Sequence, residues 1–539
     1  MNRRHAAQEF EVPTYGSPHG RSLVALLVLV GIAYAAYFIL RYDGMWIEND
    51  TSVFTGTTTA MLKAGSAFFA GQYSHGPGYP AWLGDVSLET GLSPMVVNGL
   101  LAPFFGVVFM VLTAHLLYRK FLRTEAAVAV AVLILFLVPD VMFTVLRGNH
   151  EKINVPFIML AFYCVLWVVD AVRNQDFRSI ALSTMLYYVS VFMNGVTNDY
   201  FGVFLIIATF IAALFLWLFR RPRWSGGAAL PYAKRFAATT FISGLLMVWV
   251  MVFLFPQSGS DTSLFVTLIH KLQNLFTTQV ISSNPYAIAS QQWTSPLVNT
   301  MFSVFHYGLI GISAMSIVHL FVIVVVRKTV NIRGEEYVAV ASYVALAILV
   351  AIAIPADLVG LNAGTNLELR NYTYYALFAP PIIVMMVGAL RARLAHHRKA
   401  AWLRATVASM YAILFVVGML KGTVEPLVSN VWMQYTRSER EALVVFQNHT
   451  TDTALWTGGG NRLAYLYNAL FPDSSTGDQV VGYSIGPSPY ATDIMTSPMI
   501  RASTIATQIA MPSVSGMDRV FDDGGAQIYR RPTTTPFQY

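Results

Sequence analysis

Residues 23–40 read LVALLVLVGIAYAAYFIL, an unbroken run without a charged side chain. A helix that crosses the hydrocarbon core of a bilayer needs about 20 such residues. The preceding residues 1–22 are mostly polar and include Arg3, Arg4 and Arg21, and no small-residue cleavage site follows the run. We therefore predict a retained membrane-spanning helix behind a cytoplasmic amino-terminal segment.

Ten further apolar runs follow along the chain. They lie near residues 95–117, 126–146, 153–172, 179–194, 200–219, 236–255, 301–326, 337–355, 376–390 and 402–420. The run at 179–194 is short and could join the next across Gly195–Asp199, so the count of eleven carries an error of one. With 55% hydrophobic and 12% charged residues, the composition is too apolar for a soluble protein. We predict a mainly α, polytopic membrane protein whose transmembrane part spans residues 23–420.

The basic residues predict which side of the membrane each loop occupies. Lys and Arg accumulate in cytoplasmic loops. Twenty-one of them lie in one set of alternate loops, which includes the amino terminus, and only six lie in the other set before residue 421. We therefore expect a cytoplasmic amino terminus in a plasma (inner) membrane, and extracytoplasmic loops at residues 41–94, 147–152, 256–300 and 356–375. The net charge of +7 forms no long basic tail or stripe, which argues against a nucleic-acid partner.

The tail, residues 421–539, is long enough for a small extracytoplasmic domain. Thr453–Thr457 and Ala526–Arg530 have the composition of strands, and Asp522-Asp-Gly-Gly525 is typical of a hairpin turn. We predict a small α/β domain. The single cysteine, Cys164, excludes an intrachain disulfide and a cysteine-based metal site.

The middles of the apolar runs are nearly free of charge, since Asp140, Asp170 and Asp199 lie at predicted span ends. Ionisable residues gather instead in the predicted outer loops, where a reaction site at the membrane surface would need them. Glu48 and Asp50 directly follow the first run and could supply a base to a substrate arriving from the lipid. The alternative is that two juxtamembrane acids simply face water.

The second outer loop is short and very polar. Arg147, His150, Glu151 and Lys152 lie within six residues between two apolar runs. They could form part of a site, or they could be a helix cap of mutually paired charges.

Two further basic residues are candidates for binding phosphate. Arg370 precedes a run that contains Pro380 and Pro381, and its planar fork of donors suits a phosphate group. The alternative for Arg370 is an interfacial anchor. Lys271, beside His270, lies on a predicted interfacial helix over residues 263–276.

Together these segments resemble the GT-C superfamily of membrane glycosyltransferases, especially the protein O-mannosyltransferase and aminoarabinose transferase branch. The resemblance lies in the order of short motifs. Asp50, Phe54, Ala60-Met-Leu62 and Gly65 are similar to a family pattern after the first span, and Tyr73–Pro80 is similar to its later Y-x-x-G-P-G-Y-P stretch. Glu151 corresponds to a second acid, Arg370 to an arginine before a late span, and Asp523–Tyr529 to a terminal hairpin motif.

The resemblance implies transfer of a sugar from a polyprenyl-phosphate donor to a hydroxyl of a glycan, lipid or protein acceptor. It implies Asp50 and Glu151 as the catalytic residues. Asp50 would be the general base, and Glu151 would bind the acceptor or orient a neighbouring group. Arg370, with Lys271 or Arg147, would stabilise the departing phosphate. Substrate-binding roles are expected for Glu48, Tyr73, His75, His150 and Lys152.

One difference from the family leaves the cofactor open. Many relatives carry an Asp-Glu pair where this chain has Asp50-Thr51, with Glu48 two residues earlier. Whether a divalent metal takes part is therefore undecided, and no other cofactor is expected.

Three other readings remain. The chain could transport a lipid-linked saccharide or polysaccharide, which the lack of charged residues in the middle of its spans disfavours. It could be an acyl- or phosphoethanolamine transferase, or a non-enzymatic assembly component.

Overall fold

The computed structural model describes a bundle of helices, two helices at one end of it and a carboxy-terminal unit that contains a sheet. The described residues are 18–41, 49–67, 73, 76–173, 176–198, 205–206, 245, 296–322, 334–358, 367–394, 409, 412–413, 416–420, 435–449, 454–458, 462–472, 480–481, 491–501 and 511–532.

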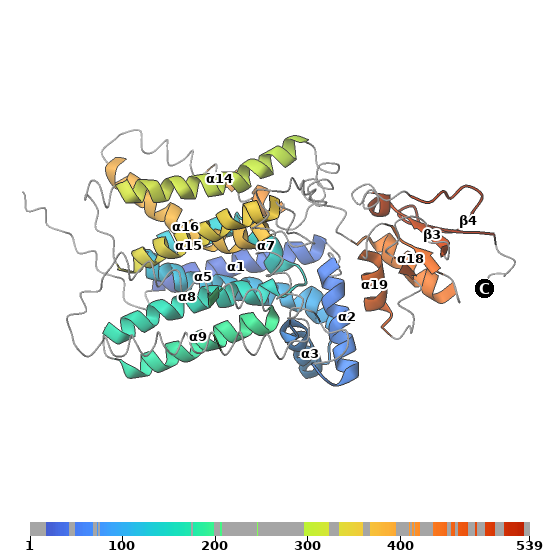
Figure 1. Ribbon diagram of the computed structural model, residues 1–539, viewed down its shortest axis with the longest axis horizontal. Coiled ribbons are helices and arrows are strands. Elements are labelled where there is room, and N and C mark those ends of the chain that lie inside the picture. The colour runs from blue at the N-terminus through green and yellow to red at the C-terminus, as the bar shows by residue number, and fades with distance from the viewer. Residues whose placement is uncertain are drawn as a thin grey trace, which may run out of the picture.

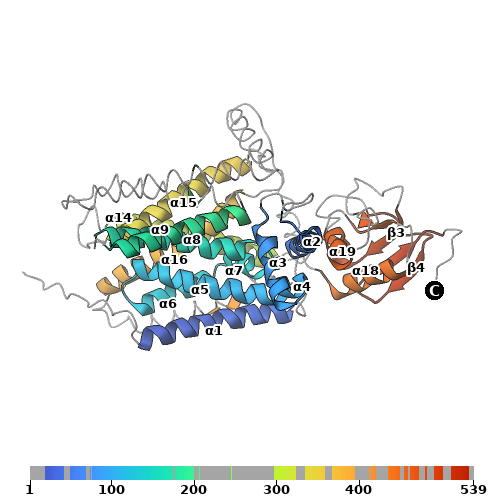
Figure 2. The ribbon, with the colours of Figure 1, turned by 90° about the horizontal axis from the view of Figure 1, so that it is seen from below.

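Long apolar helices lie side by side in one bundle (Figures 1 and 2). Four stretches of the described residues are long and apolar enough to cross a membrane: Gly20–Arg41, Pro94–Phe121, Glu151–Val168 and Phe177–Thr197. They correspond to α1 (Pro18–Arg41), to α4, η1 and α5 in succession (Pro94–Val96, Val97–Leu101, Ala102–Phe121), to α8 (Glu151–Arg173) and to α9 (Phe177–Thr197). The bundle also contains α14 (Pro296–Phe321), α15 (Gly334–Leu358) and α16 (Leu367–Leu394).

The predicted spans agree with these helices, with two differences. The short run at 179–194 is a full helix, α9. The run at 126–146 is two helices, α6 (Glu125–Phe136) and α7 (Pro139–Leu146), because Pro139 has no N–H and forces Val138 into an extended conformation. The runs at 200–219 and 236–255, and most of 402–420, lie outside the described residues, so the count of eleven stays a prediction.

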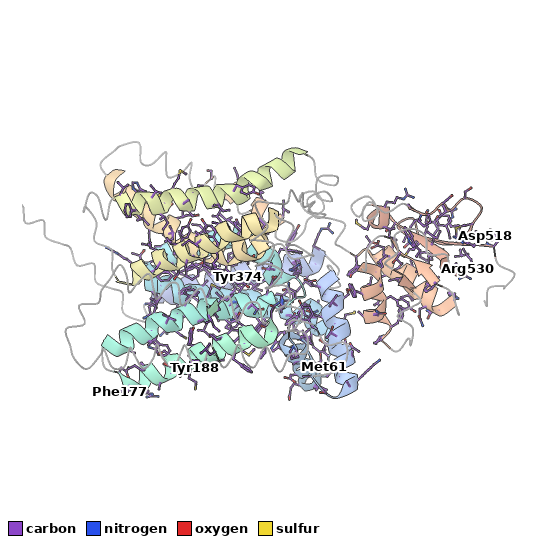
Figure 3. The ribbon with its side chains drawn as sticks, viewed as in Figure 1. Met61, Phe177, Tyr188, Tyr374, Asp518 and Arg530 are labelled. Atoms are coloured by element: carbon purple, nitrogen blue, oxygen red, sulfur yellow. The ribbon has the colours of Figure 1, made fainter. Side chains whose placement is uncertain are left out.

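The bundle interior combines apolar packing with a few internal hydrogen bonds. The Tyr118 hydroxyl donates to the carbonyl of Leu377 over 2.5 Å, and the hydroxyls of Ser313, Tyr343 and Tyr375 contact one another between α14, α15 and α16. Polar groups inside a membrane bundle need such internal partners because lipid offers none. Figure 3 shows Tyr374 among the side chains that fill this interior.

The segment 41–94, predicted as a loop, contains two helices, α2 (Asn49–Ala64) and α3 (Gly78–Thr90). They lie at one end of the bundle, between it and the carboxy-terminal part of the chain (Figures 1 and 2). Serine and threonine dominate α2 and weaken its helical pattern in the sequence. In the structure, the hydroxyls of Thr58 and Thr59 find acceptors within the helix, since they donate to the carbonyls four residues earlier.

The carboxy-terminal part has its own core and a five-stranded mixed sheet. Its elements are α18 (Arg437–His449), β1 (Ala454–Trp456), α19 (Arg462–Leu470), β2 (Val480–Val481), β3 (Ala491–Thr496), β4 (Asp518–Asp522) and β5 (Gln527–Arg530). The strand order is β2-β1-β3-β5-β4, with β1 parallel to β2 and β3, and β5 antiparallel to β3 and β4. The predicted α/β fold, both predicted strands and the hairpin at 522–525 are confirmed.

This unit packs against α2 through α19. Ser52 Oγ and Tyr435 Oη are 2.7 Å apart, and Lys63 Nζ donates to the carbonyl of Pro472 over 2.9 Å. A Cβ added at Gly56 would lie 4.0 Å from Ala469 Cα, so the two helices are in close contact there. The carboxy-terminal unit therefore covers the outer side of the helix that carries Asp50.

A buried ion pair holds the sheet together. Arg530 on β5 donates to both carboxylate oxygens of Asp493 on β3 over 2.8 and 2.7 Å, and Asp493 is fully buried. Asp493→Ala should lower the free energy of unfolding of this unit by about 3 kcal/mol, because Arg530 would keep its charge in a mostly buried place. Urea unfolding of the detergent-solubilised protein, followed by protease cleavage within 435–532, measures the change.

The matched control is Glu441→Ala, which removes the exposed pair between Arg437 and Glu441. That change should cost less than about 1 kcal/mol. Equal effects of the two substitutions would contradict the structural role given to Asp493.

Candidate active site

Two chain segments meet at the end of the bundle that lies next to the carboxy-terminal unit (Figure 1). One is the first turn of α2, which carries Asp50 and Thr51. The other is the loop Arg147–His150, between α7 and α8, with Glu151 as the first residue of α8. Asp50 and Glu151 therefore both lie at helix amino termini, where the helix dipole favours a negative charge.

Arg147 joins the two carboxylates. Its NH1 lies 3.3 Å from Asp50 Oδ2, and its NH2 lies 3.1 Å from Glu151 Oε2. Asn149 reaches the same two oxygens, because its Nδ2 donates to Asp50 Oδ2 over 3.4 Å and to Glu151 Oε2 over 2.8 Å. Asp50 and Glu151 are thus brought together, and the paired charges expected of the second outer loop are present.

The two acids differ in exposure. The side chain of Asp50 is 36% exposed, whereas that of Glu151 is 11% exposed. Among the described residues, the contacts of the Asp50 carboxylate all use Oδ2 and leave Oδ1 for another partner. Asp50 is therefore the carboxylate that an incoming molecule can reach, and Glu151 lies behind it.

Backbone contacts hold the loop against α2. The N–H of Gly148 donates to Thr51 Oγ1 over 3.2 Å, and Asn98 Nδ2 lies 3.2 Å from both the Thr51 carbonyl and Thr55 Oγ1. Asn98 is placed by the π-helical turn η1, and wider turns of this kind often occur at functional sites.

The Tyr79 hydroxyl completes this support by donating to Asn98 Oδ1 over 2.7 Å. Burial raises the pKa of Tyr79 well above its usual value, so the hydroxyl keeps its proton and remains a donor. The orientation of Asn98 toward α2 is therefore fixed by a permanent hydrogen bond.

His150 and Tyr73 lie beside Phe54 of α2, next to the site. The two rings are 5.8 Å apart, and both contact Phe54 of α2. His150 Nε2 is 2.6 Å from Asn198 Nδ2 at the end of α9.

Lys152 points away from the carboxylates. It is fully buried, its Nζ lies 5.9 Å from the centre of the Tyr79 ring, and its Cβ lies against Gly106 of α5. A buried ammonium beside an aromatic face is a cation–π contact. The structure therefore separates Lys152 from the group formed by Asp50, Arg147 and Glu151.

The structure does not describe the side chains of the other predicted site residues, so their positions relative to Asp50, Arg147 and Glu151 stay predictions. Arg370 lies in the first turn of α16, and its side chain is outside the described part of the chain. Glu48, His75 and Lys271 also lie outside the described residues.

Sequence reasoning missed Asn149, Gly148, Asn98 and Thr51. Asn98 offered a signal, because it is an amide inside the apolar run 95–117 and such groups need a partner. Gly148 and Asn149 lay within the polar loop already singled out, but nothing in their spacing indicated contact with residues 50 and 51.

The described residues form no complete metal site around these carboxylates. Among the described residues, no three His, Cys, Asp or Glu side chains gather closely enough to hold an ion. The two acids of this site, Asp50 and Glu151, are already bridged by N–H donors of Arg147 and Asn149.

Similarity to known proteins is found in three-dimensional structure and not in sequence. No family model and no curated protein matches the sequence. Among solved structures, the archaeal oligosaccharyltransferase AglB from Archaeoglobus fulgidus, in complex with an inhibitory peptide and a dolichol-phosphate, is similar with a TM-score of 0.59 at 12% identity. That match covers 96% of this chain and 75% of that chain.

Two further structures are similar. The Archaeoglobus fulgidus oligosaccharyltransferase in complex with Zn and sulfate matches with a TM-score of 0.56 at 11% identity, over 94% of this chain and 73% of that chain. ArnT from Cupriavidus metallidurans, bound to undecaprenyl phosphate, matches with a TM-score of 0.50 at 12% identity, over 95% of this chain and 98% of that chain. The chain has the GT-C fold, which confirms the predicted fold class.

The contact between the loop and α2 predicts the effect of a small substitution. A Cβ at Gly148 would lie 2.6 Å from Thr51 Oγ1, 2.8 Å from Thr51 Cγ2 and 2.9 Å from Asn98 Nδ2. Gly148→Ala should therefore push the loop from α2 and destabilise the protein by about 1–3 kcal/mol. Thermal unfolding in detergent measures this change.

Gly311→Ala on α14 is the control, because a Cβ there meets nothing within 4 Å. Alanine also favours a helix over glycine by about 1 kcal/mol. A Gly148→Ala protein as stable as the Gly311→Ala protein would show that the loop does not depend on this contact.

Proposed function

We propose that this chain is a membrane glycosyltransferase that moves a sugar from a polyprenyl-phosphate donor to an acceptor hydroxyl at the extracytoplasmic membrane surface. The observation that carries the proposal is the reachable Asp50 carboxylate, held beside Glu151 at the outer end of a GT-C bundle. AglB and ArnT, which share the fold, were solved with dolichol-phosphate and undecaprenyl phosphate. A lipid-phosphate donor is therefore the natural substrate class to test.

In the proposed reaction, the acceptor hydroxyl attacks the anomeric carbon of the sugar. Asp50 accepts the hydroxyl proton at Oδ1, the oxygen that its described contacts leave available. The bond between the anomeric carbon and the phosphate oxygen breaks, and polyprenyl phosphate departs with the electron pair. A single displacement of this kind inverts the anomeric configuration.

Glu151 is proposed to act behind Asp50. Its burial and its contacts with Arg147 and Asn149 suit a residue that orients the loop and, through it, the base and the acceptor. Tyr73 and His150 form an aromatic wall against which a sugar ring can pack. Glu48 and His75 keep their proposed substrate-binding roles. Lys152 is not proposed to bind substrate, because it is buried against Tyr79.

Arg370 is proposed to stabilise the negative charge that develops on the departing phosphate, with Lys271 as a second donor. A guanidinium binds phosphate oxygens in a bidentate manner, and the developing charge strengthens the contact in the transition state. The position of Arg370 at the start of α16 fits a group that meets a phosphate at the membrane surface.

Charge distribution supports the proposed sidedness. Basic residues concentrate in the loops opposite those that hold Asp50 and Arg370. The site, the predicted loops and the domain at 421–539 would then face the extracytoplasmic side.

Asp50→Asn tests the base. The amide keeps the size of the side chain but cannot take a proton, so transfer should fall by about 10²–10⁴-fold. Expression and binding of the polyprenyl-phosphate donor should remain. The measurement is transfer of radiolabelled sugar by purified protein in lipid vesicles.

Asp85→Asn on α3 is the matched control, because Asp85 is an exposed acid at the same end of the bundle and should tolerate the change. Full transfer by Asp50→Asn would exclude Asp50 as the base. Movement of intact donor lipid across the vesicle membrane, without transfer, would favour the transporter reading.

Arg370→Ala tests the phosphate partner. Loss of the guanidinium should reduce kcat/KM for the donor by about 10²-fold or more. The control is Arg391→Ala near the other end of the same helix, α16. Equal kinetics of the two variants would remove Arg370 from the proposed mechanism.

A further inference from the structure

Two carboxylates that share a site repel each other unless a positive charge or a proton lies between them. In this protein, Asp50 Oδ2 and Glu151 Oε2 are bridged twice, by Arg147 and by Asn149. Arg147 supplies the charge, and Asn149 supplies a second N–H donor group to the same two oxygens. The pair therefore has a resident cation that belongs to the chain itself.

The guanidinium is held in this place from three directions. Its NH1 and NH2 bind one carboxylate each, and its Cζ lies 5.1 Å from the centre of the Phe143 ring. The following residue, Gly148, is bound to Thr51 of α2. An arginine stacked on an aromatic ring and forked between two carboxylates has little freedom to leave.

The same place is unsuitable for a divalent cation. Mg²⁺ or Ca²⁺ requires six or more oxygen ligands at about 2.0–2.6 Å. The two facing oxygens already accept N–H donors, and the side chains beside them present N–H groups that would repel a metal ion. Among the described residues, no third acid or histidine joins the pair.

We propose that Arg147 takes the place of a divalent metal ion in this site, so that sugar transfer needs no such ion. The activity experiment for this inference rests on the proposed function, whereas the metal-binding experiment does not. Arg147 acts through Asp50 and Glu151 and is a positioning residue. Its removal should free the carboxylate pair for a metal.

The binding experiment uses Mn²⁺ alone as the probe and needs no activity. Purified, chelator-treated protein in detergent is titrated with MnCl₂ and followed by the electron paramagnetic resonance signal of free Mn²⁺. The wild type should show no site tighter than the detergent background. Arg147→Ala should bind one Mn²⁺ at least tenfold more tightly than the wild type, and Arg147→Ala with Asp50→Asn should lose that site.

The activity experiment compares transfer with EDTA and with added Mn²⁺. Wild-type transfer should change by less than twofold between the two conditions. Arg147→Ala should lose at least tenfold in EDTA and recover in part with Mn²⁺, a rescue that a purely structural defect would not show. Arg119→Ala, which alters a basic residue in the last turn of α5, away from the site, should behave as the wild type in both conditions.

Three results would overturn the proposal. They are loss of wild-type transfer in EDTA with recovery in Mn²⁺, a tight wild-type Mn²⁺ site that Asp50→Asn abolishes, or equal Mn²⁺ affinity of wild type and Arg147→Ala. If Arg147→Ala does not fold, Arg147→Lys replaces it. A single ammonium cannot bind both carboxylates as the guanidinium does, so this variant should also bind Mn²⁺ more tightly than the wild type. Equal affinity of Arg147→Lys and the wild type would overturn the proposal. A wild type without any transfer would reject the proposed function, while the Mn²⁺ titrations would still decide this inference.

Discussion

The site depends on the ion pairs of Arg147 with Asp50 and Glu151. Asp50 and Arg147 are far apart in the chain, and their pairing fixes α2 against the loop that opens α8. Two hydrogen bonds to Thr51 strengthen this part of the structure. The Gly148 N–H donates to the Thr51 hydroxyl, and the Asn98 side-chain amide donates to the Thr51 carbonyl. If this contact were lost, two carboxylates would face each other without a counter-charge, and the helix that presents Asp50 would lose its nearest support.

Hydropathy predicted the bundle well because lipid imposes one simple rule on every span. The apolar runs need only length, and α1, α8 and α9 appear where those runs lie. The break at Pro139 was readable in principle, since proline restricts the residue before it, but the run around it is apolar throughout. The helices α2 and α3 were harder to predict because their stability comes from packing between the bundle and the carboxy-terminal unit.

The site was predicted in part. The order of the motifs indicated that Asp50 and Glu151 belong together, and the structure brings them together. The roles of Arg147 and Asn149 depend on which oxygen each donor reaches, and a sequence holds no such distances. Lys152 illustrates the limit, since it is adjacent to Glu151 in sequence but points about 100° around the helix toward Tyr79.

The contact between Ser52 and Tyr435 links residues 383 positions apart. During synthesis, α2 leaves the ribosome before most of the bundle, whereas the unit that covers it is made after the bundle. The helix that carries Asp50 must therefore wait, without its outer support, until nearly the whole bundle has been inserted and the carboxy-terminal sheet has folded. The support around this site can therefore be completed only after the bundle has been made.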